Sequence, residues 1–423
     1  MDSTFEVLYG AAFLDLCGAS MLTMQLPNHL RELGASLTTV GFIGSIYGLV
    51  QLISSPLVGG YADRHNKRSL LLLCFAACGV GYFLLGAVSS LWCIILLRIY
   101  LGVVKHSLNL IKSALSDLTA GLSSPKQLET QGYYQSACSL AFIISPPVAG
   151  YLIQMHHGYF IIGVCVTLIY SLNAVLIWNR LPMDGSSHST SKLVKSTQSS
   201  PKMTKDSKDF TADASQSLTQ KSFWSFLTLP DVDRTLLLLL LTGCFFHSFS
   251  AMIWRNSSTL LYREQFQLSP PQIGWLISFN GCVQAVAGLL VKYITKLLPR
   301  SLYQLLLACA LSTFVMLSIG NLSNPSYLYV FMVPLSVAAM LSKISYQSYV
   351  NQTIGKGHTA YLIGIMGSIN SFSRLSSPII VGYLMDSYTS AMSLYVAAFS
   401  TTLAAMLYFT VEFKVRINKS KDD

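Results

Sequence analysis

The stretch VGFIGSIYGLVQ, from Val40 to Gln51, is repeated in modified form as IGWLISFNGCVQ, from Ile273 to Gln284. Two glycines, a serine, a valine and the final glutamine are identical between the two segments, which lie 233 residues apart. Glycine and serine at a four-residue period let membrane helices approach one another closely. The match therefore indicates two related helices at corresponding places in a duplicated chain.

A second pair of segments repeats at almost the same offset. Residues 145–152 read SPPVAGYL, and residues 377–384, which lie 232 positions later, read SPIIVGYL. Two matches at nearly one spacing are typical of transporters built from two similar halves, which rock about a solute site between them. The proline and glycine shared by these segments are expected to pack helices together: Pro146, Gly150, Pro378 and Gly382.

Composition places both halves in a membrane. Of the 423 residues, 52% are hydrophobic and only 11% are charged, whereas a soluble domain averages about 25% charged residues. The hydrophobic residues fall in blocks of about 18–24, long enough to cross a hydrocarbon core of ~30 Å, and lipid forces such blocks to be helical. We therefore predict an all-α polytopic fold of twelve transmembrane helices in two six-helix bundles. The expected spans are 5–27, 37–59, 70–88, 91–112, 133–154, 159–181, 234–256, 270–291, 301–320, 326–349, 361–384 and 391–411.

A polar segment separates the two halves. Residues 182–221 are rich in Ser, Thr and Lys and nearly free of apolar residues, which is typical of a disordered tether. A linker regulated by phosphorylation is the alternative. We expect an N-terminal bundle, a cytoplasmic linker, a C-terminal bundle and a cytoplasmic tail: 1–181, 182–232, 233–411 and 412–423.

Basic residues outside the spans predict the orientation. One set of loops, together with the tail, holds most of them, and the opposite set holds little beyond Arg31 and Arg263. Loops rich in Lys and Arg face the cytoplasm, so both termini are expected there. Because the formal charge of +10 is distributed in this way, it does not indicate nucleic-acid binding. Plasma membrane and endolysosomal membrane both remain open as locations.

The loop between the second and third expected spans carries a recognisable motif. GGYADRHNKR, from Gly59 to Arg68, resembles the loop motif G-x-L-a-D-r-x-G-r-k of the major facilitator superfamily. It departs at Tyr61 and Asn66, where the motif has Leu and Gly. Asn is a residue that tolerates the left-handed turn, so the second departure is mild.

Two further motifs support this resemblance, which covers the whole chain. Arg98-x-x-x-Gly102 resembles the family's second motif, and SPPVAG from Ser145 resembles a degenerate form of its antiporter motif. The chain is similar in these respects to the tetracycline-efflux, drug:proton antiporter type.

The resemblance implies a gate at the first of these motifs. In the family the motif aspartate, here Asp63, meets the start of the eleventh helix at the positive end of its dipole. The basic residues of the motif help latch the halves together in the outward-facing state. The gating residues implied are Gly59, Asp63, Arg64, Lys67 and Arg68.

Ionisable residues inside spans are costly and usually mark function. Arg98, Lys105 and Lys112 recur every seven residues and, with Asn109, would share one face of a continuous fourth helix, drifting only about 20° per step. We favour Lys105, near the midplane, as a solute or coupling residue over a structural ion pair. Arg98 matches the arginine that the family uses in proton coupling and helix locking, and Lys112 can reach the interface by snorkelling.

Asp15 lies near the centre of the first expected span and either pairs with Lys105 or carries a proton. His247 is its counterpart in the seventh span and either titrates near neutral pH or packs as a neutral ring. Family resemblance places Lys343 and Arg374 along the cavity. Four amides either add hydrogen-bond partners there or join helices to one another, which is the commoner role: Gln51, Gln135, Asn280 and Gln284. The excess of cations over carboxylates predicts a small organic anion or a zwitterion with an acidic group.

We therefore expect a secondary active transporter of a small organic solute, preferably an anion, coupled to protons and working by alternating access. A facilitative uniporter and a solute sensor without net flux are the alternatives. The sequence has no GxxxxGK[ST], HExxH or GxSxG motif, which argues against an ATP-driven pump or an enzyme. We expect no cofactor or metal, no nucleic acid, and a functional monomer whose partners are the solute, protons and the bilayer.

Overall fold

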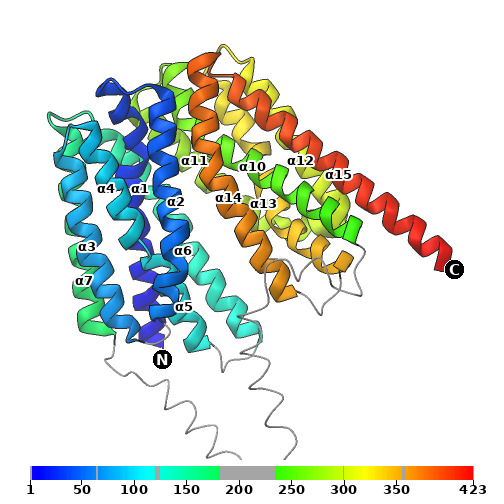
Figure 1. Cartoon of the computed structure of the whole chain (residues 1–423), viewed down its shortest axis with the longest axis horizontal. Helices are drawn as coiled ribbons and strands as arrows, with labels where there is room; N and C mark the ends of the chain where they lie inside the picture. The colour runs from blue at the N-terminus through cyan, green and yellow to red at the C-terminus, as the bar shows by residue number, and fades with distance from the viewer. Residues whose placement is uncertain are drawn as a thin grey trace, which may run out of the picture.

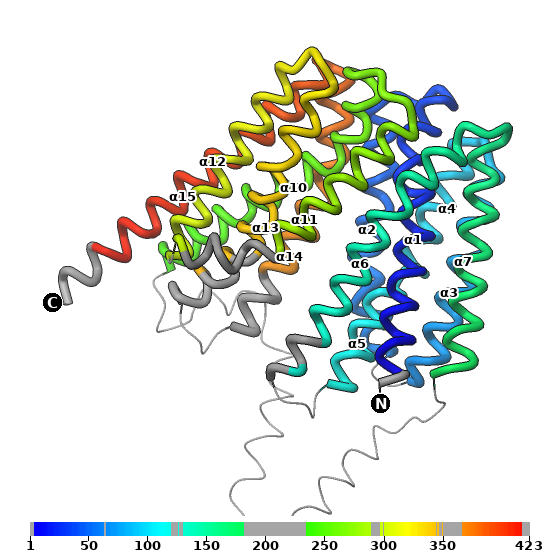
Figure 2. Tube along the Cα trace, turned by 180° about the vertical axis from the view of Figure 1, so that it is seen from behind, coloured from blue at the N-terminus to red at the C-terminus, as the bar shows by residue number. Residues whose placement is uncertain are grey.

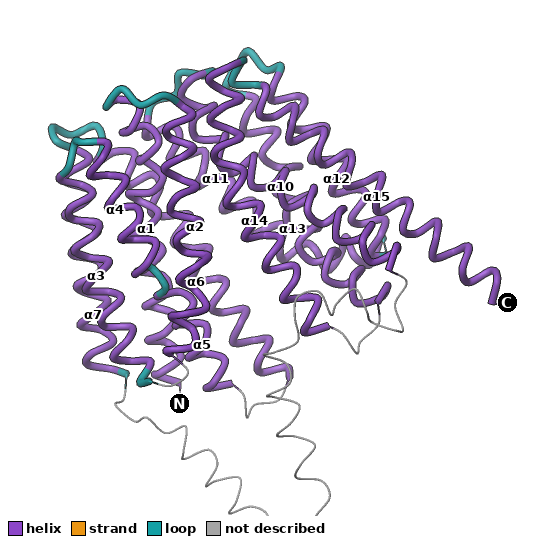
Figure 3. Tube along the Cα trace, viewed as in Figure 1, coloured by secondary structure: helices purple, strands orange, loops and turns teal. Residues whose placement is uncertain are grey.

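A computed structural model describes residues 2–62, 65–119, 124–181, 234–298, 300–354 and 359–422. Every regular element in these ranges is an α-helix (Figure 3). The predicted linker, 182–232, lies outside the described residues. Eight segments within these ranges are long and apolar enough to cross a membrane by length and composition.

The two halves of the chain form two helical bundles (Figure 1). The N-terminal bundle contains α1 (Asp2–Glu32), α2 (Leu37–Ala62), α3 (Lys67–Ala87), α4 (Leu91–Val104), α5 (Ser107–Thr119), α6 (Ser124–Leu152) and α7 (Gly158–Arg180). The C-terminal bundle contains α10 (Arg234–Glu264), α11 (Pro270–Leu297), α12 (Ser301–Gly320), α13 (Tyr327–Ile354), α14 (Thr359–Ser387) and α15 (Met392–Asp422).

Several helices extend beyond the expected spans. α1 continues past the expected span end at residue 27 to Glu32, and α10 continues past residue 256 to Glu264. Both extensions end in Arg-Glu, and a helix supplies its own backbone hydrogen bonds outside lipid as well as inside it. The extra turns carry charged side chains to the surface, where they matter for the contact between the bundles.

The bundles meet at one end and diverge toward the other. We call the end where α1 leads into α2 the upper face, and the opposite end, where α1 begins and α15 ends, the lower face. Figures 1 and 2 show from opposite sides that the bundles approach at the upper face and splay apart toward the lower face. Each bundle has its own apolar core, exemplified by Phe75 and Tyr82 in the first and Leu394 and Ala397 in the second.

Candidate functional site

Glycines bring the bundles into backbone contact near the upper face. A Cβ added at Gly41 on α2 would lie 2.1 Å from the carbonyl oxygen of Pro378 on α14. At the corresponding crossing, a Cβ at Gly274 on α11 would lie 2.4 Å from the carbonyl oxygen of Pro146 on α6. Neither position has room for a side chain. The glycine shared by residues 40–51 and 273–284 is therefore required for the helices to come this close.

The second repeat supplies the other half of each crossing. A Cβ at Gly382 would lie 2.3 Å from the carbonyl oxygen of Leu37, and one at Gly150 would lie 2.6 Å from that of Pro270. The residues expected to pack helices therefore lie where α14 meets α2 and where α6 meets α11. The two contacts repeat the same geometry in each half.

Reciprocal ion pairs close the same face. Arg31 Nε lies 3.3 Å from Glu264 Oε1, and Arg263 Nη2 lies 3.0 Å from Glu32 Oε1. Arg263 and Glu264 follow Arg31 and Glu32 by 232 positions. The arginine of each repeat therefore pairs with the glutamate of the other. In the sequence, Arg31 and Arg263 contributed only to the predicted orientation. The glutamate that follows each arginine is the signal that could have predicted the ion pairs.

Asp386 at the upper end of α14 adds a further contact. It lies beyond the expected span 361–384, and its carboxylate accepts hydrogen bonds from Leu37 N at 2.9 Å and from Thr38 N at 2.6 Å. Partial burial opposes ionisation, but these bonds and one from the Thr38 hydroxyl outweigh it and hold the pKa of Asp386 below its ordinary value. The carboxylate thus caps the positive end of α2 across the two bundles.

Reversing both arginines, Arg31→Glu with Arg263→Glu, is expected to favour separation of the upper face. Two exposed pairs, each worth about 0.2–1 kcal/mol, would become repulsive contacts that salt screens. Double electron–electron resonance between spin labels on the upper loops of the two bundles would show longer distances in this variant than in the wild type at low salt. Adding Glu32→Arg and Glu264→Arg should restore the closed distance. A change that is equal at low and high salt would argue against an electrostatic cause.

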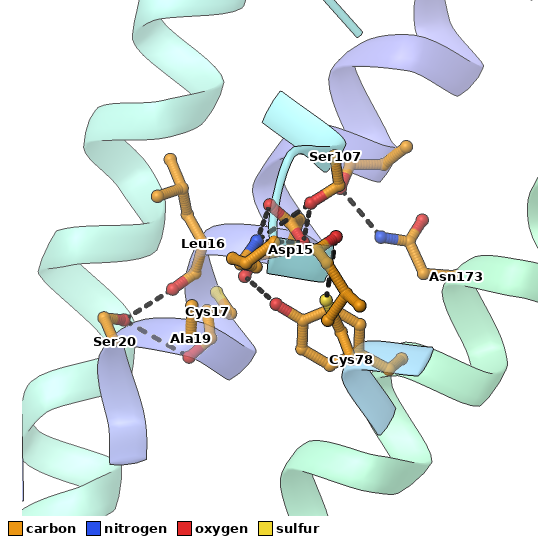
Figure 4. A network of polar contacts seen from close by, with 12 residues as sticks. Asp15, Leu16, Cys17, Ala19, Ser20, Cys78, Ser107 and Asn173 are labelled. Atoms are coloured by element: carbon orange, nitrogen blue, oxygen red, sulfur yellow. Dashed lines mark hydrogen bonds and ion pairs between the residues drawn. The ribbon is translucent and has the colours of Figure 1, made fainter. Parts of the chain in front are cut away.

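Inside the N-terminal bundle, Lys105 and Asp15 form a buried ion pair (Figure 4). Lys105 Nζ donates to Asp15 Oδ1 at 2.6 Å, to Asp15 Oδ2 at 2.5 Å and to Ser107 Oγ at 2.9 Å. The Ser107 hydroxyl lies 2.9 Å from Asp15 Oδ1 and donates to it, so Asp15 and Ser107 are linked directly as well. An ammonium has three donors, and all three are used here. Of the two roles left open for Asp15, the structure shows the pairing with Lys105.

The fourth expected span is interrupted at this ion pair. The continuous helix predicted over 91–112 is wrong, because α4 ends at Val104 and α5 begins at Ser107. Side chains from α2 satisfy the interrupted segment, with Gln51 Nε2 donating to the Lys105 carbonyl at 2.9 Å and Ser54 Oγ lying 2.8 Å from His106 Nε2. Lys105 consequently turns into its own bundle toward α1.

The other residues that were expected to share a helix face with Lys105 lie in two different environments. Arg98 is buried, with its guanidinium 4.1 Å from the centre of the Tyr47 ring. Asn109 and Lys112 are exposed on α5, and Lys112 Nζ lies 5.8 Å from the centre of the Tyr134 ring. The structure therefore does not present one basic face along the fourth span.

The gating motif is partly described. Asp63 and Arg64 lie outside the described residues, and an added Cβ at Gly59 would meet nothing within 4 Å. Lys67 pairs with Asp117 and donates to Ser113 at 2.7 Å. Arg68 donates to the Trp178 carbonyl and lies 5.4 Å from the Trp178 ring centre. Both cations therefore bind within the N-terminal bundle, while the lower face is splayed.

The C-terminal bundle contains a cavity of about 150 Å³ lined by uncharged polar groups. His247 and Gln284 both line it, so the structure brings these two predicted residues together. Asn280 is also in the wall, and Ser336 Oγ donates to its Oδ1 at 2.6 Å. The position that holds Asp15 in one bundle therefore holds a histidine beside a neutral cavity in the other.

Exposed cations lie on helices α10, α13 and α14 of the C-terminal bundle. Lys343 on α13 and Arg374 on α14 are exposed. Arg255 on α10 is a further exposed cation, near enough to Arg374 for their charges to interact. We missed Arg255 in the sequence because the expected seventh span ended one residue after it. The Arg-Glu pair at 263–264, matching that at 31–32, indicated that the helix continues.

These features are those of a duplicated membrane transporter, and comparison with known families agrees. The sequence model of the Major Facilitator Superfamily matches residues 8–378 and 239–422. The chain belongs to the major facilitator superfamily. The membership confirms the resemblance first seen in the loop motif, and superfamily proteins are multi-pass integral membrane transporters, not enzymes.

Curated members of the superfamily align along much of the chain. Solute carrier family 22 member 18 of Mus musculus is 25% identical over 388 residues. The match covers 90% of this chain and 89% of the mouse protein. Tetracycline resistance protein class B of Escherichia coli is 27% identical over 184 residues, covering 43% of this chain and 45% of its own. The second match bears out the expected likeness to tetracycline-efflux proteins.

Solved structures share the fold across nearly the entire length. A bacterial homologue of the human lysosomal transporter Spinster has a TM-score of 0.73 at 13% identity, covering 96% of each chain. The human organic anion transporter MFSD10 (TETRAN) has a TM-score of 0.64 at 18% identity, covering 96% of this chain and 99% of its own. These likenesses confirm the predicted all-α, two-bundle superfamily architecture.

Proposed function

We propose that this superfamily member is a proton-coupled secondary transporter that moves a small organic anion by alternating access. Two observations together support the proposal: the symmetric contact at the upper face and the exposed cations on α5, α10, α13 and α14. Rocking about such a contact would expose a central solute alternately to either side of the membrane.

The charge balance between the bundles supports an anion. Arg255, Lys112, Lys343 and Arg374 are exposed, while the buried carboxylate of Asp15 is already bound by Lys105. An organic anion is also what the human structural neighbour transports according to its description. Proton coupling is proposed for the network of Asp15 and Lys105, since Asp15 is a carboxylate deep within a described span.

The upper face is proposed to be extracellular or lumenal. Basic residues such as Lys67, Arg300 and Lys414 lie at the lower ends of described helices, and loops of that charge stay in the cytoplasm. Both termini would then be cytoplasmic, in a plasma or endolysosomal membrane. We propose a monomer as the working unit, because each monomer contains both bundles.

Uptake into proteoliposomes tests the proposal. The purified full chain is expected to accumulate labelled organic anions in preference to matched cations, and to do so only when a pH gradient is imposed. Accumulation to equilibrium without a gradient would identify a facilitative uniporter. Saturable binding without uptake would identify a solute sensor, and a preference for cations would refute the anion assignment.

A further inference from the structure

Two arginines on the packed helices α10 and α14 of the C-terminal bundle lie near enough for their charges to interact. Arg255 on α10 is accessible to solvent although protein atoms surround it densely, as expected for a side chain in a hollow of the molecule. The charge of Arg374 on α14 acts on it repulsively. Among the described residues, no carboxylate forms an ion pair with either guanidinium.

Hydrogen bonds between helices hold this pair of arginines in place. Asn256 Nδ2, on the residue next to Arg255, donates to Ser377 Oγ at 2.7 Å. Ser377 follows Arg374 by three positions and therefore lies on the same side of α14. On the other side, Ser45 Oγ of α2 donates to the Leu375 carbonyl at 2.7 Å. The two guanidiniums thus extend from a firmly packed junction.

The two arginines lie at different heights along their helices. Arg255 lies nine residues before the upper end of α10, which is about 13 Å at 1.5 Å per residue. Arg374 lies thirteen residues before the upper end of α14, which is roughly 20 Å. Arg374 thus lies near the middle of α14, at the level where transporters of this build hold their solutes, and Arg255 lies in the upper part of α10.

Two unpaired guanidiniums near each other need a counter-charge. Like charges repel strongly where the dielectric is low, and the planar fork of arginine matches the two oxygens of a carboxylate or phosphate. We propose that Arg255 and Arg374 together bind the anionic group of the transported solute. This assignment rests on the proposed function and names the residues that would give it its anion preference.

A cavity in the C-terminal bundle reaches α10 near Arg255, although neither arginine lines it. Ala251 in the cavity wall precedes Arg255 by one helical turn, and Trp254 in the same wall is its neighbour in sequence. The wall offers uncharged groups, including the amide of Asn280 whose oxygen is already bonded to Ser336. The solute is therefore a small organic molecule with a carboxylate or phosphate at one end.

Matched pairs of small molecules test this site on the purified full chain. The probes are benzoate with benzamide, lactate with lactamide, and glucose 6-phosphate with glucose, each titrated in thermal unfolding at constant ionic strength. We expect at least one anion to raise the unfolding midpoint while its uncharged analogue does not. Carboxylate and phosphate probes separate the two chemistries. No response to any of the three anions overturns the proposal.

Substitutions then connect the response to the two arginines. Arg255→Gln and Arg374→Gln are each expected to weaken the anion's affinity about tenfold to a hundredfold, the range for charge-assisted hydrogen bonds. Arg300→Gln, which makes the same charge change at the lower start of α12, should leave the affinity unchanged. Arg255→Lys and Arg374→Lys keep the charge without the fork and should be intermediate. They provide the test if a glutamine variant fails to fold.

The outcomes distinguish the site from the proposed function. Unchanged affinity in the combined Arg255→Gln/Arg374→Gln variant, or an equal loss in Arg300→Gln, overturns the site but leaves an anion transporter. A wild-type protein that accumulates only uncharged or cationic solutes in proteoliposomes overturns both the anion preference and the site. Both the site and the proposed function are supported if the wild type shows proton-coupled uptake of the anion and the folded Gln variants do not.

Discussion

Lys105→Met is expected to lower the free energy of unfolding by about 3–5 kcal/mol, the range found when one partner of a buried ion pair is removed. Asp15 is completely buried, and Lys105 supplies a donor to both of its carboxylate oxygens. Without the lysine, the carboxylate would keep Ser107 as a donor but would have no counter-charge. Denaturant unfolding of the purified protein in detergent measures the loss.

Two controls separate the ion pair from other effects of removing a lysine. Lys112→Met deletes the same side chain at an exposed position of α5 and should change stability by no more than about 0.5 kcal/mol. The double variant Asp15→Leu/Lys105→Met removes both charges and should recover most of the loss. Equal destabilisation by Lys112→Met, or no recovery in the double variant, would contradict the uncompensated charge of Asp15 as the cause of the loss.

Transport by the double variant addresses the role we favoured for Lys105 from the sequence. The structure buries Lys105 with all three donors engaged, so it does not face the solute in this conformation. If the double variant folds but no longer responds to a pH gradient, the pair takes part in coupling. If it transports normally, the pair only stabilises the N-terminal bundle.

Features with a local or periodic cause could be predicted from the sequence. Lipid-length apolar blocks require helices, and the repeated glycines mark close helix crossings because small residues are needed wherever two backbones touch. The structure places Gly41 and Gly274 at such crossings, each against a proline from the other repeat. The two-bundle architecture follows from these elements alone.

Features that depend on tertiary partners could not be predicted in the same way. The seven-residue spacing of Arg98, Lys105 and Lys112 implies one face only if the helix is continuous, and the break at Lys105 is stabilised by Gln51 and Ser54 from another helix. Those partners, Gln51 and Ser54, lie far from residues 91–112 in the sequence, so the pattern within the fourth span could not reveal them. Assigning a charged residue to the solute path therefore required knowing which charges are already paired.

Gly41→Ala is expected to prevent tight closure of the upper face and to reduce transport severely. The new Cβ would lie 2.1 Å from the Pro378 carbonyl oxygen, and a backbone atom in a packed helix cannot rotate away as a side chain can. Overpacking of this kind costs about 1–3 kcal/mol, and each 1.4 kcal/mol changes a two-state ratio roughly tenfold. Every cycle of alternating access passes through the closed upper face, so uptake should fall by a similar factor.

Distances between the bundles measure this closure directly. Spin labels at His156 and Asn324, on upper loops of the two halves, are placed in a background where the exposed Cys93 and Cys282 are serine. Gly41→Ala should lengthen the distance between the labels, and its repeat mate Gly274→Ala should do the same, because its Cβ would lie 2.4 Å from a backbone oxygen.

Two glycines of the same helix provide graded controls for Gly41→Ala. An added Cβ at Gly48 would have its nearest neighbour at an ordinary 3.8 Å, and one at Gly60 would meet nothing within 4 Å. Gly48→Ala and Gly60→Ala share the gain in helix propensity of any Gly-to-Ala change but should leave the distance and uptake unchanged. If all three variants behave alike, helix propensity and not the crossing explains the effect. A lengthened distance in Gly41→Ala alone would show that contact between the repeats holds the upper face shut.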